Sequence, residues 1–403
     1  TTNITSVEWQ FVNGRAFQTS VISITDSVNL FGEPVTTTTT TQNAYGWTQS
    51  SHMVRQGYML LTQTTDSTSD STDVFGNPVH TVTHQVNQYG EFTPVEDSPN
   101  PISGYFWGVT NVADFSQTTT GTDIFGATYT TVVNSVTWGY INGRALQLVV
   151  VSTTDSFNIW GEAVTTVTTT ANEYGWIKTA NMVRPGLLLL TQTIDSTSDS
   201  TDVFGNPVHT VTHQVNHYGE FTAQGPHAIS GYFWGVTSVS EFSQVTTGID
   251  IFGAQYTTQV TSVTWEFVNG RAFQASVTSV TDSLNLFGEA VQTQTTTTNQ
   301  YGWTQSSHMV RQGYMLLTQT IDSVSTGTDV FGNKVITTTH QVNEYGEFRV
   351  EKNRIFPISG WFWGVTSVSE FSQVTTGIDI FGAQYTTQVT SVTWEFVRGR
   401  AFQ

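Results

Sequence analysis

The stretch that decides the fold is Val263-Thr-Trp-Glu-Phe-Val-Asn-Gly-Arg-Ala-Phe-Gln274, in which bulky apolar residues alternate with polar ones before an Asn-Gly pair. Alternation with a period of two places the apolar side chains of a strand on one face. Asn-Gly between two such runs is a hairpin signal. The stretch therefore predicts two antiparallel strands joined by a tight loop.

This hairpin stretch occurs four times. Its glycines are Gly14, Gly143, Gly270 and Gly399, which are 129, 127 and 129 residues apart. We therefore divide the chain into unit 1 (1–133), unit 2 (134–260), unit 3 (261–389) and the start of a fourth unit (390–403). A fixed period of this kind is the signature of repeat architectures, in which each unit packs on its neighbours. The two ends share one repeat phase, which favours a window of a longer array.

A shorter repeat lies inside each unit: an aromatic residue and a glycine that follow an Asp by a few residues. It divides each unit into three hairpin subrepeats. In such turns Asp accepts backbone N–H groups and Gly supplies a positive φ, and we expect the aromatic ring to pin each turn onto its neighbour. The predicted turn glycines are Gly32, Gly76, Gly126, Gly161, Gly205, Gly253, Gly288, Gly332 and Gly382, with Gly14, Gly143, Gly270 and Gly399 in the hairpin loops.

Val, Thr and aromatic residues dominate the tracts between turns, and no sustained helical spacing of apolar residues occurs. Nine subrepeats of two strands each predict about 18 antiparallel strands. The expected fold is all-β: tandem antiparallel hairpins that form a long spiralling sheet, tube or solenoid-like array with essentially no helix.

The loop of the quoted hairpin has two alternative registers. A two-residue Asn269-Gly270 loop sets Trp265 and Phe273 on opposite faces. A three-residue loop from Val268 to Gly270, ending in a glycine bulge, pairs Trp265 with Phe273 and puts all the large apolar groups on one face. We therefore predict the three-residue loop.

Composition excludes several classes of function. The 403 residues include 13 Lys and Arg against 31 Asp and Glu, a net charge of −18, so the chain lacks the positive surface that nucleic acid or anionic lipid requires. There is no Cys, which excludes disulfides, thiolate metal sites and a Cys nucleophile. No apolar run is long enough for a transmembrane helix. The Thr tracts at 36–41, 165–170 and 293–298 fit a wet lumen, a partner surface or an O-glycosylated exterior.

The turns Asp73 to Asn77, Asp202 to Asn206 and Asp329 to Asn333, together with Tyr140-x-x-Gly143-Arg144, resemble those of the RHS/YD-repeat family. Proteins of that family wind antiparallel hairpins into a spiralling sheet that forms a tube or shell. The resemblance covers the turns alone. It implies this architecture and an extracellular setting, and it carries over no functional residue.

Two polar patterns are candidates for metal binding. His80 and His84, repeated as His209 and His213, lie four residues apart on a strand and so face one side, where they form a metal pair or fill a polar face. The acidic stretches offer carboxylates for a structural Ca²⁺ ion. The Ca²⁺ candidates are Asp66, Asp70, Asp73, Asp195, Asp199 and Asp202.

Three tryptophans in repeated aromatic clusters, Trp107, Trp234 and Trp363, are candidates for stacking on sugar rings. Packing between subrepeats is the competing interpretation, because aromatic side chains supply most of the area that a sheet so poor in aliphatic residues buries. Catalysis needs a singular site, whereas nearly every candidate residue here recurs by duplication. We therefore expect no catalytic residue and no cofactor beyond the Ca²⁺ candidate.

The sequence favours a non-enzymatic structural protein of the cell surface or extracellular space that assembles into a filament, tube or sheath by strand pairing. Its partners are expected to be copies of itself, head to tail, because residues 391–403 repeat residues 6–18 in phase and the C-terminal strand fits the slot beside another chain's first strand. Glycans, bound or attached to Thr and Ser, are further expected partners. A carbohydrate-binding adhesin is the main alternative, and an outer-membrane barrel is a third.

Overall fold

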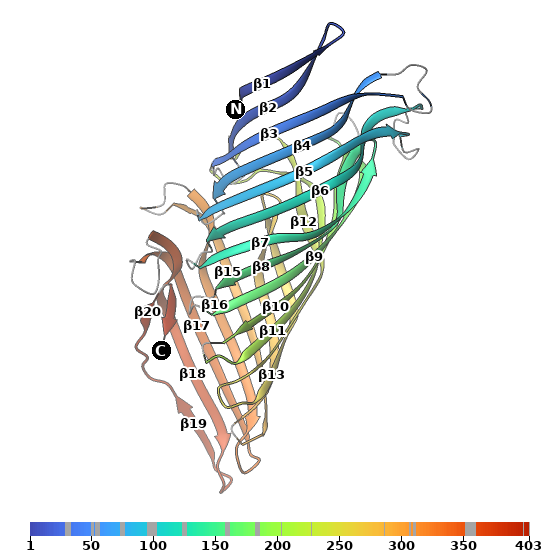
Figure 1. The fold of residues 1–403 in the computed structure, drawn as a ribbon. Helices are drawn as coiled ribbons and strands as arrows, with labels where there is room; N and C mark the ends of the chain where they lie inside the picture. The colour runs from blue at the N-terminus through green and yellow to red at the C-terminus, as the bar shows by residue number, and fades with distance from the viewer. Residues whose placement is uncertain are drawn as a thin grey trace.

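The computed structural model of the chain shows an all-β fold (Figure 1). It describes residues 1–28, 34–49, 52, 57–72, 77–94, 103–122, 127–157, 162–181, 186–202, 204–226, 228–285, 287–305, 308, 312–350, 360–397 and 399–402. Nineteen strands form one sheet in which each strand pairs antiparallel with the next along the chain, and two more form a separate hairpin. Within these ranges no residue is helical, and hence no helix is present that spans a membrane. The predicted array of tandem hairpins is confirmed.

The strands are long and follow one another closely. They are β1 (Thr2–Val12), β2 (Arg15–Val28), β3 (Pro34–Thr48), β4 (Gly57–Thr72), β5 (Pro78–Phe92), β6 (Phe106–Thr122), β7 (Thr128–Ile141), β8 (Arg144–Phe157), β9 (Ala163–Ile177), β10 (Gly186–Thr201), β11 (Pro207–Thr222), β12 (Tyr232–Ile249), β13 (Gln255–Val268), β14 (Arg271–Leu284), β15 (Ala290–Gln305), β16 (Gln312–Thr328), β17 (Lys334–Val350), β18 (Gly360–Ile378), β19 (Gln384–Gln388), β20 (Glu395–Val397) and β21 (Arg400–Phe402).

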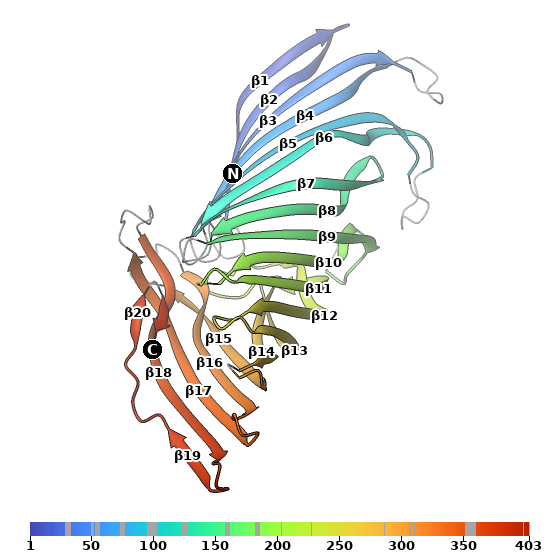
Figure 2. The same ribbon diagram turned by 60° about the horizontal axis from the view of Figure 1, so that its bottom comes forward.

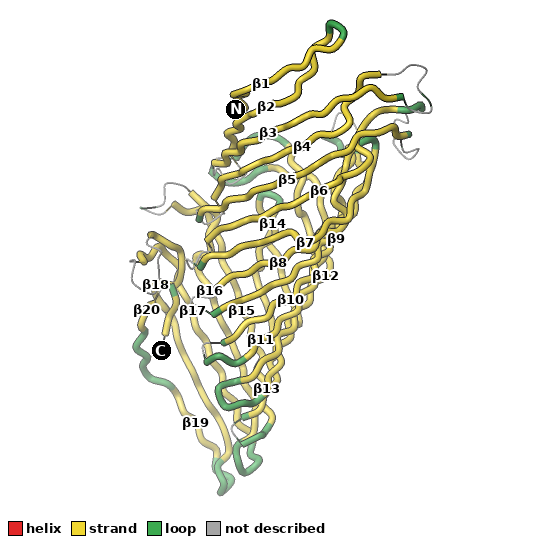
Figure 3. The backbone as a smooth tube through the Cα atoms, viewed as in Figure 1, coloured by secondary structure: helices red, strands yellow, loops and turns green. Residues whose placement is uncertain are grey.

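The sheet is a single open layer that curves and twists along its length (Figures 1 and 2). The first six strands lie at one end and β15 to β19 at the other, and the strand direction turns gradually between them. This is the accumulated twist between neighbouring strands that open sheets show. Because consecutive strands are antiparallel, their connections gather along two opposite edges of the sheet (Figure 3).

Every sixth pairing is short, and we call these three short pairings the seams. The pairing of β6 with β7 runs only from Thr118↔Val132 to Thr122↔Thr128. The β12–β13 and β18–β19 pairings are equally short. In each seam a tyrosine ring lies over a glycine, since a Cβ added at Gly248 would lie 2.5 Å from the hydroxyl oxygen of Tyr256. The seams set off groups of six strands, and the unit boundaries inferred from sequence fall a few residues beyond them.

The predicted three-residue hairpin loop is wrong. Asn269 and Gly270 both have positive φ, 50° and 73°, and Val268 pairs directly with Arg271 across a two-residue loop. Asn tolerates the left-handed region, so this loop needs no third residue. Beyond a bulge at Ala275, the register sets Val263 opposite Val277. Phe273 consequently packs on Tyr301 and Tyr314, whereas Trp265 contacts Phe242.

The turns at the opposite edge share one geometry. In the turn after β10, the Asp202 carboxylate accepts the backbone N–H groups of Phe204 and Asn206, and Gly205 has a φ of +83°. The turns at Gly253, Gly288, Gly332 and Gly382 repeat this arrangement. The hairpin glycines Gly14, Gly143, Gly270 and Gly399 also have positive φ. The remaining predicted turn glycines, Gly32, Gly76, Gly126 and Gly161, lie outside the described residues.

The aromatic residues of these turns do not pin them onto their neighbours, which corrects the expectation from sequence. All five described turn phenylalanines are exposed: Phe204, Phe252, Phe287, Phe331 and Phe381. The rings extend past the ends of the strands, where no second layer covers them.

Little of the chain is buried. The buried apolar residues of the described part are Val268, Tyr314, Met315, Trp363 and Val365, which lie on β13, β16 and β18. The accessible surface is 22261 Å² for 44.4 kDa. A compact monomer of this mass exposes about 15,600 Å². A single-layer sheet accounts for the excess, because neither of its faces is covered by a second layer.

Candidate functional site

One row of side chains crosses the whole sheet and consists of hydroxyl residues alone. Each of the nineteen strands contributes one Thr or Ser in register with its neighbours, and we call this row the hydroxyl ladder. Its members are Thr2, Thr25, Thr37, Ser69, Thr81, Thr119, Thr131, Thr154, Thr166, Ser198, Thr210, Thr246, Thr258, Thr281, Thr293, Ser325, Thr337, Thr375 and Thr387.

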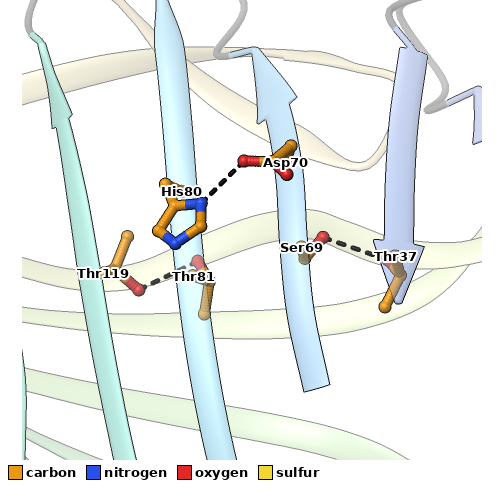
Figure 4. A network of polar contacts seen from close by, with 6 residues as sticks. All are labelled: Thr37, Ser69, Asp70, His80, Thr81 and Thr119. Carbon is orange, nitrogen blue, oxygen red and sulfur yellow. Dashed lines mark hydrogen bonds and ion pairs between the residues drawn. The ribbon is translucent and has the colours of Figure 1, made fainter. Parts of the chain in front are cut away.

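The ladder hydroxyls are hydrogen-bonded to one another across every second gap between strands. Figure 4 shows two of these bonds, Thr37 to Ser69 and Thr81 to Thr119, each 3.1 Å long. The remaining seven are 2.8 to 3.0 Å long. Most ladder residues are half-buried. Cross-strand Thr pairs of this kind contribute about 0.2–1 kcal/mol each, so the ladder is a distributed stabilising element.

The ladder also accounts for part of the Thr tracts. In the first tract, Thr37 faces the ladder side and bonds to Ser69, whereas Thr36, on the other face, donates to the Asp26 carboxylate over 2.8 Å. The same division recurs with Thr166 and Thr165 in the second tract. The hydroxyls of these pairs are therefore engaged with neighbouring strands.

The opposite face of the sheet, which we call the charged face, carries acid–imidazole pairs. His80 and Asp70 are register partners on β5 and β4, and their Nδ1 and Oδ1 atoms are 2.6 Å apart (Figure 4). The pairs His84–Asp66, His209–Asp199, His213–Asp195 and His340–Asp322 have the same separation. The histidines singled out in the sequence thus each face an Asp across one strand gap.

Three of these histidines reach a second carboxylate on the next strand. The Nε2 atom of His213 lies 3.5 Å from Glu241, and that of His340 lies 3.4 Å from Glu370. His84 and Asp114 are 3.8 Å apart in unit 1. The hydrogen bond to Asp195 raises the pKa of His213, desolvation opposes the shift, and the Coulombic attraction of Asp195 and the contact with Glu241 add to it. Asp322 and Glu370 act in the same way on the pKa of His340.

Unit 3 replaces one of these pairs as a whole. Where units 1 and 2 have Asp70–His80 and Asp199–His209, unit 3 has Thr326 opposite Ile336. Both partners change together, so neither an unpaired Asp nor an unpaired His is left at this position. The residues in this row are therefore matched to each other across the strand gap.

The Ca²⁺ candidates lie apart from one another. Asp66 and Asp70 face separate histidines and are four residues apart on an extended strand, which is about 13 Å. Asp195 and Asp199 repeat this arrangement, and Asp202 accepts the N–H groups of its own turn. Asp73 lies outside the described residues. Within the part of the chain that the structure covers, no three His, Asp or Glu side chains are grouped as a metal site.

The three candidate tryptophans pack within the sheet. Trp107 donates its indole N–H to the carbonyl of Leu60 over 2.8 Å, and Trp234 and Trp363 make the same bond to Leu189 and Leu316. The side chain of Trp363 is only 9% exposed. An indole in this position offers little ring face to a sugar. The geometry thus matches the competing interpretation, packing between subrepeats.

Each cluster exposes the aromatic residue two positions before its tryptophan, Tyr105, Tyr232 or Trp361, and the first cluster also exposes Phe106. His52 stacks on Tyr105 at 3.5 Å and contacts Glu91. His308 stacks on Trp361 at 3.6 Å, and its Nδ1 lies 3.0 Å from Glu347. His52 and His308 are not among the residues predicted from the sequence, although both lie in a repeated Ser-Ser-His-Met string, at 50–53 and 306–309.

Comparison with known proteins adds no function. No protein-family model matches the chain, and no curated protein matches it significantly. The chemistry of the chain has to be inferred from its two sets of cross-strand contacts. These are the hydroxyl ladder on one face and the acid–imidazole pairs on the charged face.

Removing one ladder hydroxyl should destabilise the sheet. Thr246→Val keeps the shape of the side chain but leaves the half-buried Thr210 hydroxyl without its 3.0 Å partner. We expect urea denaturation to show a loss of about 0.5–1.5 kcal/mol. Thr247→Val, on the exposed charged face, is the matched control and should change stability by less than about 0.5 kcal/mol. Equal losses in the two variants would contradict a stabilising role for the ladder.

The histidine pairs should make stability depend on pH. Because the folded pKa of His213 and His340 lies above the unfolded value, their contribution is present below pH about 6.5 and is lost as pH rises through the folded pKa. We expect the urea midpoint to fall between pH 6 and pH 8. The double variant His213→Gln/His340→Gln should show a smaller fall. An unchanged pH dependence in that variant would refute the assignment.

Proposed function

We propose that the chain is a non-enzymatic structural repeat protein whose copies assemble into a filament, tube or sheath by pairing of sheet edges. The single open layer supports this proposal, because within the residues that the structure describes β1 pairs only with β2 and β19 only with β18. Unpaired edges are templates for pairing with another chain. The excess of exposed surface supports it as well.

The observation that carries the proposal is a docking contact repeated at each seam. The hairpin that opens a unit lays its glycine against the last strand of the preceding unit. Val109 donates its N–H to the carbonyl of Gly143 over 2.9 Å, and Val236 does the same to Gly270. We call the surface of β18 around Gly364 and Val365 the seat. The hairpin β20–β21 occupies it, with Val365 bonded to Gly399 over 2.7 Å.

The hairpin β1–β2 repeats the hairpins at Gly143, Gly270 and Gly399, but in the described structure its loop docks on no strand. Gly14 would meet nothing within 4 Å if it carried a Cβ, whereas a Cβ at Gly143, Gly270 or Gly399 would come within 2.5–2.6 Å of a phenylalanine ring. Trp9 is 49% and Phe11 75% exposed. Their counterparts Trp265 and Phe267 are only partly exposed. The hairpin of one copy therefore fits the seat of another copy.

The seat's own hairpin is held less completely than its counterparts. In unit 3 the strand that follows the seam is continuous as β13, residues 255–268. The corresponding segment after β18 forms strand only at β19 and β20, and residues 389–394 carry no strand. We propose that the β1–β2 hairpin of another copy displaces β20–β21 and continues the sheet. The first strand of one copy thereby takes the place of β19 beside β18.

An extracellular or cell-surface location stays part of the proposal. Its support is the resemblance of the turns to RHS/YD repeats. Carbohydrate binding is kept as the alternative, and its support is the repeated exposed aromatics Tyr105, Tyr232 and Trp361, of which Tyr105 and Trp361 stack on histidines.

Two equivalent glycines should respond in opposite ways to one substitution. Asn tolerates positive φ, as Asn13 does at 50°, so Gly14→Asn leaves the free hairpin intact. It adds a Cβ that would collide with Phe348, which lies on β17 next to the seat of another copy. We expect this variant to form no filaments. Gly399→Asn loosens the chain's own hairpin from the seat and should form filaments faster than the unchanged chain.

The measurement is negative-stain electron microscopy, with light scattering to follow growth. Gly205→Asn, at an open turn whose glycine has nothing within 4 Å, is the matched control and should assemble normally. Circular dichroism confirms that each variant keeps its strands. Filaments of unchanged number in Gly14→Asn, or discrete particles alone in the unchanged chain, would refute the proposed assembly.

A further inference from the structure

A row of exposed apolar residues follows one edge of the sheet. The turns between consecutive strands place five phenylalanines at their tips, where these residues are 60 to 88% exposed: Phe204, Phe252, Phe287, Phe331 and Phe381. Three of the turns expose an aliphatic residue beside the ring: Ile251, Val330 and Ile380. We call this row the ridge. It lies on different elements from the seat and from the hairpin β1–β2.

The turns hold the ridge residues in a fixed presentation. In the turn after β16, Asp329 accepts N–H groups from Phe331 and Asn333, and the N–H of Gly332 donates to the Asp329 carbonyl. Although desolvation acts in the other direction, the hydrogen bonds from Asn333 and Phe331 lower the pKa of the Asp329 carboxyl. Because the turn backbone is already held by these hydrogen bonds, binding costs little further conformational entropy there.

The residue types of the ridge recur in every turn of the sequence. All nine turns of the sequence carry an aliphatic residue followed by an aromatic one and Gly, although the residue before this trio varies between Asp and Asn and the residue after it varies among Asn, Glu and Ala. The aromatic is Phe in eight turns and Trp160 in the ninth. In the described turns these side chains are exposed, so packing within the chain does not account for them.

The ridge is large enough for a stable protein interface. The exposed apolar side chains of the five described turns amount to about 900 Å², from about 200 Å² for a whole phenylalanine. A standard interface buries about 800 Å² on each partner. Because the turns recur at every second strand, the tips are about 9.6 Å apart, which leaves room for one ring between two others.

We propose that the ridge is a self-association surface whose partner is the ridge of a second copy of this chain. A row of tips with a fixed spacing is matched over several turns by a partner that has the same spacing. A two-fold operation sets the tips of one copy between those of the other. The chain's net charge of −18 disfavours the anionic lipid surface that would otherwise suit exposed aromatics.

The charge of the chain gives this association a distinctive salt dependence. Two copies of like charge repel each other, and Asp202, Asp250, Asp329 and Asp379 lie in the turns themselves. Salt screens this repulsion and strengthens apolar contact. The ridge contact is therefore stronger at high than at low ionic strength.

The experiment is sedimentation velocity on the full chain in the Gly14→Asn background, in which the proposed end-to-end assembly is blocked. We expect a reversible dimer that is favoured by high salt. The triple variant Phe204→Ser/Phe252→Ser/Phe331→Ser should raise the dimer Kd by about tenfold or more. The matched control, Val132→Thr/Val167→Thr/Val211→Thr, removes exposed apolar residues from the strands instead and should leave the Kd unchanged.

Two results would overturn the proposal. One is a triple phenylalanine variant that dimerises as well as the valine control. The other is a Gly14→Asn chain that stays monomeric at every salt and protein concentration. The single variant Phe381→Ser changes the most exposed ridge residue and should not affect folding. It should raise the dimer Kd as well, and an unchanged Kd would count against the proposal. Filament formation is scored separately by microscopy, so failure of the ridge and failure of the end-to-end assembly are distinguishable.

Discussion

Cross-strand pairing is the interaction on which the rest of this structure depends. A single-layer sheet has almost no core, so each strand is held mainly by pairing with its neighbours, and a few side chains, such as Trp107 on β6, also bond to the next strand but one. The hydroxyl ladder makes this pairing specific, because a slip by one residue would turn the ladder position of a strand onto the charged face. Asp70 and His80 would then meet hydroxyl groups in place of each other. The ladder and the acid–imidazole pairs thus define one register from opposite faces of the sheet.

The same constraint explains the composition and the unsatisfied surfaces. Side chains that hydrogen-bond to the neighbouring strand are short and polar, and β-branched residues favour strands. This accounts for the many Thr and Ser residues and for the low content of charged residues. A sheet that is stabilised by cross-strand pairing has no inherent end, and in the proposed assembly the β1–β2 hairpin of one copy docks on the β18 seat of another. The turn edge is left with Phe204 and its counterparts exposed. The proposed end-to-end and ridge contacts cover these two kinds of surface.

Much of this fold is predictable from sequence because its signals are local. Asn269-Gly270 and the alternation around it give the hairpin, and the Asp-x-x-Gly turns give the period. The loop type is not predictable in this way, because the two-residue loop is accompanied by a bulge at Ala275, which sets Val263 opposite Val277 and has no signal of its own in the sequence. The exposure of Phe204 contradicts the general rule that aromatic residues pack.

The candidate site was only partly visible in the sequence. His80 and His84 were recognisable as residues of one face, but their Asp partners follow from a pairing register that sequence alone does not fix. The hydroxyl ladder needs every register at once, since Thr37 and Ser69 are 32 residues apart. The only sign of the hydroxyl ladder in the sequence is the Thr tracts. They contain ladder residues but do not show which of them pair across the strands.

The most direct test of the account is a disulfide between copies. If β1 of one copy takes the place of β19, Thr2 lies opposite Thr375 of the other copy, as Thr131 lies opposite Thr119 within the chain. Opposed residues on antiparallel strands are close enough for a disulfide, and the chain has no other Cys. Mixing a Thr2→Cys chain with a Thr375→Cys chain under mild oxidation should give a crosslinked heterodimer. Equal crosslinking to Val374→Cys, whose side chain faces the other side, or none with Thr375→Cys, would contradict it.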